Sequence, residues 1–253
     1  MRWVLCGEVG AAGIDTTFGV GEENIMHEKE IIYRGNTHAG KAASYEIGRP
    51  EYPSKFFDYL YNEARILSTM DVIVDIGCGT GKIAKQFLEY GNTVVAIEPD
   101  PDMLRIANAK LNGYSNYSSF QRTAERTGLG AGTIDCIFCG NSFQWFDREA
   151  VVPEFKRILR KNGYVIISTL GGGKEDTSCL FLPGTSIEKN FCFTVVNTFE
   201  TYFHAALSVS SAPSIGDETY EHFCNEVKKS FCEEKAKTVM RLNCTIGNAK
   251  NLR

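Results

Sequence analysis

The residues best suited to chemistry form one short stretch, Val72–Lys82, with the sequence VIVDIGCGTGK. Its first residues predict a buried strand, and Gly77, Gly79 and Gly81 predict a sharp turn into a helix. Because no side chain covers such a turn, a ligand can approach the main chain near the positive end of the helix. The stretch therefore predicts a nucleotide-type site.

Two familiar kinds of nucleotide site fit this turn poorly. A phosphate-binding P-loop needs glycine where Ile76 stands and Ser or Thr where Ile83 stands. A dinucleotide site places its third glycine at the position of Lys82. Here an acid, Asp75, precedes the glycines instead. That acid suits a ligand with an ammonium group better than a diphosphate.

Three further predicted strand ends carry groups that suit the same ligand. Glu98 lies 23 residues after Asp75, a spacing at which an acid can accept hydrogen bonds from ribose hydroxyls. Ala124-Glu125 could meet a base through main chain and carboxylate, or be an exposed loop. The main chain of Asn141-Ser142 would pass the ligand, and the aromatics Phe143, Trp145 and Phe146 that follow face either the site or the core.

Strands and helices alternate along the middle of the chain, which implies right-handed crossovers and a mostly parallel sheet. The helix after the fourth strand is expected to stop at Asn162-Gly163. Periodicity predicts strands near residues 72–76, 93–97, 119–122, 133–139 and 164–168, with weaker ones near 191–196 and 238–246. It predicts helices near residues 56–67, 82–90, 103–107, 151–159, 199–206 and 220–231.

The length of 253 residues suits one α/β domain with additions, or two small domains, and the composition, 43% hydrophobic and 23% charged, is ordinary for a globular protein. We expect an irregular N-terminal arm over residues 1–40 and the domain over 41–253. Its core would be 70–170, and 171–253 would hold the last two strands and substrate-side additions. A net charge of −4 gives no bias toward DNA. No apolar run is long enough for a membrane span, so we expect a cytoplasmic protein.

The cysteines and histidines do not predict a metal site. Cys136 and Cys139 form a C-x-x-C inside a predicted strand, where their side chains would point to opposite faces. The four histidines are not spaced as metal ligands. We therefore expect reduced thiols and no bound metal.

Four segments carry a resemblance to a known family. The form DIGCGTG resembles motif I of class I S-adenosylmethionine-dependent methyltransferases, and Glu98–Met103 resembles the E-P-x-x-x-M of the same family. Phe143–Asp147 is similar to the A-F-H-W-F-D of the small-molecule branch called methyltransferase type 11. Tyr45–Pro53 resembles the lead-in Y-x-x-x-R-P-x-Y-P of that branch. The resemblance covers about residues 42–168.

The resemblance implies an α/β, Rossmann-like, doubly wound sheet of seven mostly parallel strands, with helices on both faces and the last strand antiparallel. It implies S-adenosylmethionine as cofactor. The residues it assigns to the cofactor are Tyr45, Arg49, Asp75, Gly77, Cys78, Gly79, Gly81, Glu98, Met103, Ala124, Glu125 and Asn141. No catalytic residue is assigned, and the substrate-side candidates are Tyr45, Gln144 and Trp145. Gln144 stands where the branch often has His, and it cannot take a proton near neutral pH.

The expected function is methyl transfer to a small-molecule acceptor by in-line displacement. No Asn/Asp-Pro-Pro-Tyr/Phe run follows the fourth strand, which argues against adenine or glutamine nitrogens as acceptors. One alternative is an RNA or protein methyltransferase that docks through Lys156-Arg157 and Arg160-Lys161, although these residues are more simply interpreted as the solvated face of a helix. Another is a catalytically silent methyltransferase-like partner subunit. Acceptor contacts are expected from the arm and from residues 170–190, and oligomeric state stays open.

Overall fold

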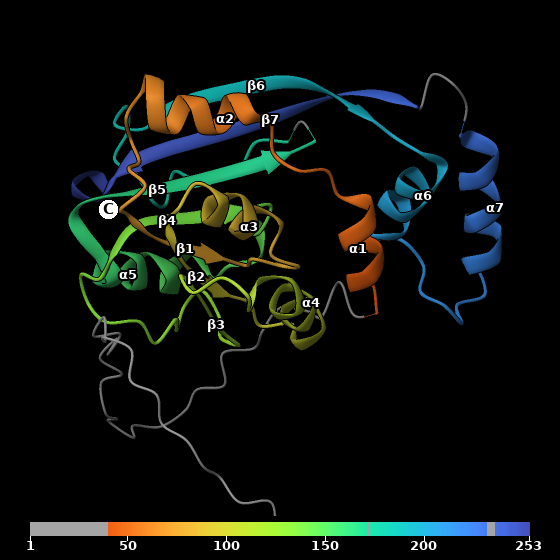
Figure 1. Ribbon diagram of the computed structural model, residues 1–253, viewed down its shortest axis with the longest axis horizontal. Helices are drawn as coiled ribbons and strands as arrows, with labels where there is room; N and C mark the ends of the chain where they lie inside the picture. The colour runs from red at the N-terminus through yellow and green to blue at the C-terminus, as the bar shows by residue number, and fades with distance from the viewer. Residues whose placement is uncertain (1–39, 172, 232–235) are drawn as a thin grey trace, which may run out of the picture.

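The computed structural model describes residues 40–171, 173–231 and 236–253 (Figure 1). The strands are β1 (Val72–Ile76), β2 (Thr93–Ile97), β3 (Tyr117–Phe120), β4 (Ile134–Gly140), β5 (Leu159–Leu170), β6 (Ile187–Val196) and β7 (Lys237–Asn248). The helices are α1 (Ala42–Gly48), α2 (Ser54–Asp58), α3 (Lys82–Glu89), α4 (Pro101–Leu111), α5 (Arg148–Ile158), α6 (Phe199–Leu207) and α7 (Tyr220–Ser230). A π-helical turn, Tyr59–Glu63, continues α2, and 3₁₀ turns cover Phe143–Trp145 and Ala249–Asn251.

The seven strands form one sheet in the order β3-β2-β1-β4-β5-β7-β6. The pairs from β3 through β5 are parallel, whereas β7 runs antiparallel to both β5 and β6. This confirms the Rossmann-like, mostly parallel sheet with an antiparallel last strand. Apart from Gly40, the predicted N-terminal arm lies outside the described residues.

Hydrophobic side chains cover both faces of the sheet, as the near-continuous apolar runs of its central strands require. On one face, α2 and α3 supply the fully buried Phe56, Phe57 and Phe87. On the other, α5 supplies Phe155 and Ile158. Burying one such apolar side chain stabilises the folded state by roughly 1.5–3 kcal/mol. These two layers therefore hold the carboxyl ends of the strands in place.

The two cysteines of the C-x-x-C behave as the period of a strand predicts. Cys136 is fully buried in the cluster that contains α2 and α3, and Cys139 is fully buried in the cluster that contains α5. Both are free thiols. They therefore act as small apolar residues of β4 on opposite faces of the sheet.

One predicted boundary is wrong: α5 ends at Ile158 and not at Asn162-Gly163. Leu159 is already extended, with φ −72° and ψ 141°, and it pairs with Ile134 of β4. Strand pairing therefore begins at Leu159, four residues before the glycine that was expected to cap the helix. Gly163 instead lies where an added Cβ would come within 2.8 Å of the Asp135 carbonyl oxygen.

Three helices, α1, α6 and α7, lie together beyond the end of the sheet to which the parallel strands point (Figure 1). At Gly48, α1 approaches α6 so closely that an added Cβ would be 2.1 Å from the backbone nitrogen of Ala205. Ser44 Oγ and His204 Nδ1 form a hydrogen bond of 3.1 Å between the same helices. We call α1, α6 and residues 208–212 together the cap.

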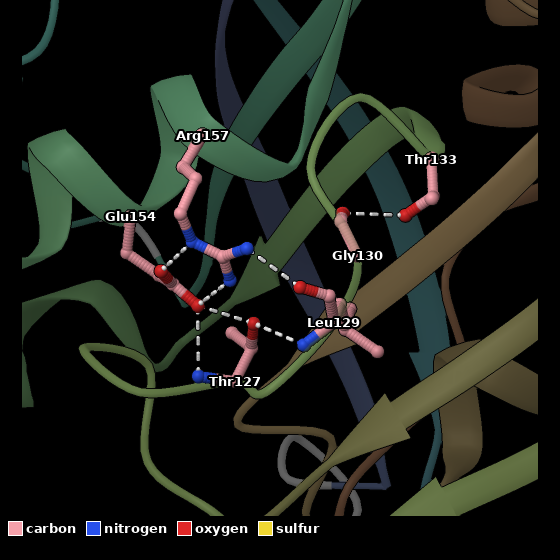
Figure 2. Close-up of polar contacts among 6 residues, drawn as sticks. All are labelled: Thr127, Leu129, Gly130, Thr133, Glu154 and Arg157. Atoms are coloured by element: carbon pink, nitrogen blue, oxygen red, sulfur yellow. Dashed lines mark hydrogen bonds and ion pairs between the residues drawn. The ribbon is translucent and has the colours of Figure 1, made fainter. Parts of the chain in front are cut away.

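A polar cluster fastens α5 to the loop that precedes β4 (Figure 2). Arg157 donates through Nε to Glu154 Oε2 at 2.7 Å and through Nη1 to the Leu129 carbonyl at 2.7 Å. Glu154 Oε1 also accepts the Thr127 amide at 3.0 Å. Burial raises the pKa of Glu154, but the hydrogen bonds from Arg157 and Thr127 outweigh it, so that this pKa is lowered overall. The cluster keeps the loop after Glu125 in place.

Replacing Arg157 with Met should lower the free energy of unfolding by roughly 1–3 kcal/mol, because it leaves the buried Glu154 carboxylate without its charged partner. Urea denaturation measures this. The control is Arg160→Met: Arg160 pairs at 2.6 Å with Asp135, a more exposed partner than Glu154, so its loss should cost less than about 1 kcal/mol. Equal losses in the two variants would contradict the role given to the cluster.

Candidate functional site

The glycine turn after β1 depends on three residues in the left-handed region. Gly77, Gly79 and Gly81 have φ values of 71°, 55° and 75°, which other residues rarely adopt. The amides of Gly77 and Cys78 donate to the Ile97 carbonyl of β2 at 2.8 and 3.2 Å. An added Cβ at Gly77 would lie 2.5 Å from the Cβ of Ser142, so a side chain there would collide with the loop after β4.

Asp75 lies at the base of this turn as a fully buried carboxyl group. Among the described residues, neither of its oxygens has a hydrogen-bond partner of normal geometry. Burial, together with the nearby charge of Glu98, raises the pKa of Asp75 well above its ordinary value, and the Ala84 amide offsets this only in part. A buried acid without a partner is costly to stability, which indicates that it serves a ligand.

Glu98, directly after β2, is the second buried acid of the site. Its Oε2 accepts the Gly79 amide at 2.8 Å, and its Oε1 accepts the Asp100 amide at 3.0 Å. Burial raises the pKa of Glu98 to about 7, although both amide hydrogen bonds act in the opposite direction. The side chain therefore titrates near neutral pH and lies against the glycine turn.

A cavity of about 320 Å³ opens at this end of the sheet. It brings together most of the residues singled out from the sequence, which are Tyr45, Arg49, Gly77, Gly79, Glu98, Met103, Ala124, Glu125, Asn141, Gln144 and Trp145. Three others do not line it. Asp75 and Cys78 are buried, and Gly81 packs against α4, where an added Cβ would be 2.8 Å from Leu111 Cδ1.

Ser142 and Phe146, which the sequence analysis also considered, line the cavity as well, and so do residues that it had not assigned to the site: Pro99, Asp100, Thr123, Gly140, Val209 and Ser210. Most of these neighbour a predicted residue in the chain. Val209 and Ser210 do not, because they follow α6 and reach the cavity only through the packing of the cap. The described residues between 170 and 190, expected to contact the acceptor, do not line this cavity, and their contact with an acceptor stays a prediction.

The cap side of the cavity is formed partly by Tyr45 and Arg49. The guanidinium carbon of Arg49 lies 5.2 Å from the centre of the Tyr45 ring, within cation–π range. Arg49 Nε is buried without a hydrogen-bond partner among the described residues. Burial raises the pKa of Tyr45, an effect that Arg49 opposes, so the phenol stays protonated near neutral pH.

The loop after β4 closes the opposite side. Asn141 adopts φ 52°, and its Oδ1 accepts the Leu170 amide at 2.8 Å. Gln144 donates through Nε2 to the Asn141 carbonyl at 3.0 Å, while its side chain stays exposed. Trp145, 39% exposed, also lines the cavity. Gln144 and Trp145 are thus accessible to a second ligand that approaches from solvent.

The basic residues predicted to share one helix face are divided between α5, which holds Lys156 and Arg157, and β5, which holds Arg160 and Lys161. Arg157 is bound to Glu154, and Arg160 forms an ion pair with Asp135. In the described parts of the chain, no helix is long and apolar enough to cross a bilayer. Within those same parts, no group of three or more His, Cys, Asp or Glu side chains could hold a metal ion.

The strand order with an antiparallel β7, the acid before the glycine turn and the acid after β2 together define a class I methyltransferase fold. Comparison with known proteins agrees. Residues 74–167 match the family model described as a methyltransferase domain. Over these residues the chain is therefore similar to methyltransferase domains, in agreement with the resemblance to the type 11 branch of the class I family.

Among relatives, an uncharacterised methyltransferase of Mycobacterium tuberculosis is 33% identical over 120 residues. The match covers 47% of this chain and 46% of the relative, so it spans less than half of that protein. A solved structure of a candidate type II methyltransferase from Anaeromyxobacter dehalogenans has a TM-score of 0.57 at 16% identity, covering 79% of this chain and 98% of that one. Phosphoethanolamine N-methyltransferase 2 of Haemonchus contortus, solved with phosphomonomethylethanolamine and S-adenosylhomocysteine, has a TM-score of 0.50 at 16% identity, covering 83% and 57%. These likenesses to solved structures establish the fold.

The raised pKa of Glu98 predicts how stability changes with pH. The folded-state pKa of about 7 exceeds the ordinary 4.5, so the folded state holds this proton more tightly than the unfolded chain. The contribution of Glu98 to the free energy of unfolding is complete below about pH 4.5 and is lost as the pH rises to about 7, by up to roughly 3 kcal/mol.

Without added ligand, Glu98→Gln should show a smaller fall in unfolding free energy over this range than wild type. Urea denaturation at several pH values measures it, with the exposed Glu149→Gln as control; parallel curves for wild type and Glu98→Gln would refute it.

Proposed function

We propose that the protein transfers the methyl group of S-adenosylmethionine to a small-molecule acceptor. The observation that carries this proposal is the buried pair Asp75 and Glu98 beneath a glycine turn. Among the described residues, the Asp75 oxygens have no hydrogen-bond partner of normal geometry, and a cationic ligand would offset the cost of burying this carboxyl group. The match of residues 74–167 to a methyltransferase domain supports the same conclusion.

The residues of the cavity fit this cofactor in chemistry and in space. Asp75, at the base of the glycine turn, suits an ammonium group, and Glu98 suits the ribose hydroxyls. Gly77 and Gly79 keep the turn clear, since a side chain at Gly77 would collide with Ser142. The adenine would meet the Ala124-Glu125 segment. When bound, S-adenosylmethionine supplies a methyl group on a sulfonium centre that leaves readily as a thioether.

Further residues complete the proposed binding set. Met103 and Asn141 line the cavity beside Glu98 and the glycine turn, and Tyr45 and Arg49 cover it from the cap. Cys78 and Gly81 shape the turn from behind, without lining the cavity. The cavity residues that are left to contact an acceptor are Gln144, Trp145, Val209 and Ser210. Tyr45 would lie between the cofactor and the acceptor.

The protein's task is then to align the acceptor and exclude water, and alignment can contribute roughly 7–11 kcal/mol to lowering a barrier. Trp145 and Tyr45 provide apolar surface for this purpose, and the Gln144 amide can orient a polar acceptor group. None of these groups accepts a proton near neutral pH. The lining acids are engaged elsewhere: Glu98 by two amides, Asp100 as the cap of α4, and Glu125 by the Asp147 amide at 2.9 Å.

Because the described residues offer the site no available base, they favour an acceptor whose nucleophilic atom needs no deprotonation. Among common acceptors, a carboxylate is ionised at neutral pH and satisfies this condition. We therefore place carboxylate-bearing small molecules first, with methyl esters as the product. In this reading Tyr45 and Gln144 orient the acceptor and do not transfer protons.

Cofactor binding is tested by titrating S-adenosylhomocysteine calorimetrically into wild type and Glu98→Gln. A hydrogen bond to a charged group is worth roughly 1.5–3 kcal/mol, so the variant should bind at least about tenfold more weakly. Glu149→Gln removes an exposed acid of the same type and should bind as wild type does. No binding by wild type, or equal binding by Glu98→Gln, would overturn the proposal.

The acceptor class is tested with radiolabelled S-adenosylmethionine and a defined panel of aliphatic and aromatic carboxylic acids, each paired with the amide and alcohol of the same skeleton. We expect label in base-labile methyl esters, and Tyr45→Phe should keep kcat within about fivefold because the phenol accepts no proton. Transfer to amines or phenols, with none to carboxylates, would contradict the carboxylate class while leaving the methyltransferase proposal in place.

A further inference from the structure

The residue before α1, Lys41, has an unusual environment for a lysine. Its side chain is buried, with 8% exposed, and its ammonium donates to three main-chain carbonyls. The acceptors are Val209 at 3.0 Å, Ser210 at 3.1 Å and Ala212 at 2.6 Å. A lysine ammonium has three N–H donors, so each carbonyl can take one. Among the described residues, no carboxylate forms an ion pair with Lys41.

The segment that holds this ammonium is a compact turn directly after α6. The Ala212 amide donates to the Val209 carbonyl at 3.1 Å and closes the turn. Before it, the Ser208 amide donates to the His204 carbonyl at 3.0 Å, which continues the last turn of the helix. The carbonyl end of a helix carries a partial negative charge, so this position favours a cation. The turn and the helix end together bind the Lys41 ammonium.

This contact joins two parts of the cavity wall that are far apart in the sequence. Three residues after Lys41, Ser44 bonds His204, and at Gly48 the helix α1 meets α6 in backbone contact. Tyr45 and Arg49 extend from α1 and its end to the cavity, while the turn after α6 provides Val209 and Ser210. The two helices are therefore tied along the whole length of α1.

We propose that Lys41 is a positioning residue that couples cofactor binding to the acceptor side of the cavity. A ligand that orders Tyr45 and Arg49 orders α1, and through the Lys41 ammonium it also orders Val209 and Ser210. The acceptor wall then reaches its final position when the cofactor is bound. This inference rests on the proposed function for the identity of the ligand, but the fastening of the turn by Lys41 does not.

Hydrogen exchange measured by mass spectrometry tests the proposal, comparing wild type with Lys41→Met. Without ligand, the amides of residues 208–212 should exchange at least about tenfold faster in the variant, with residues 73–81 unchanged. With saturating S-adenosylhomocysteine, wild type should gain protection both in α1 and in residues 208–212. In Lys41→Met, α1 should still gain protection and residues 208–212 should not.

The matched control is Lys85→Met, which removes an exposed lysine that pairs with Glu89 across α3 and should exchange as wild type does throughout. If Lys41→Met does not fold, Lys41→Gln keeps an N–H donor and should show the same loss of coupled protection. Unchanged exchange at residues 208–212 without ligand would overturn the fastening role. Protection of that segment by S-adenosylhomocysteine in the Lys41 variants would overturn the coupling. A wild type that fails to bind S-adenosylhomocysteine would instead refute the proposed function, and the comparison without ligand would still decide the role of Lys41.

Discussion

The structure around the cavity depends on one unfavourable arrangement: two carboxyl groups, those of Asp75 and Glu98, are buried side by side under a turn made of glycines. Burying an acid without a charged partner destabilises a fold, so the rest of the molecule must offset that penalty. The parallel register of β1 and β2, which pairs Asp75 with Ala96, brings both acids to the same end of the sheet. The large aromatic layer of α2 and α3 supports those strands from behind.

The same constraint explains why the glycine turn and the cap have their shapes. The amide of Gly79 is held by Glu98, so the turn cannot move without disturbing the second acid. Ser142 fills the space that a side chain at Gly77 would need, and its hydroxyl donates to the Ile76 carbonyl at 2.7 Å. On the far side of the cavity, Tyr45 places its ring near the buried acids, whose charges raise its pKa further. The cavity is thus bounded by groups that depend on one another.

Sequence alone predicted the parts of this site that are local. A buried strand, a glycine turn and a helix follow one another within twenty residues, so their chemistry could be inferred from Asp75 to Gly81 without a partner segment. Glu98 followed from the spacing of two strands. The end of α5 was mispredicted because strand pairing with Ile134 overrode the glycine signal at Gly163.

Long-range packing was beyond the sequence patterns. Residues 170–190 were expected to contact the acceptor, yet Phe181 forms a β-bridge with Leu252. The Phe181 ring also packs so closely on Gly247 that a Cβ added there would lie 2.1 Å from it. That anchor draws the segment back along the sheet and away from the cavity. Val209 and Ser210 take its place because α6 packs on α1, and Lys41 contacts a turn that lies 168 or more residues further along the chain. No local pattern marks such a contact.

The central claim is that burial favours the protonated forms of Asp75 and Glu98, and that a cationic cofactor provides the partner that favours their ionised forms. Calorimetric titration of S-adenosylhomocysteine at pH 7, in two buffers with different ionisation enthalpies, counts the protons released on binding. Because burial raises the pKa of Glu98 to about 7 and that of Asp75 well above its ordinary value, we predict that binding releases protons. The same binding with no proton released would contradict the claim, because it would mean that both acids are already ionised without the ligand.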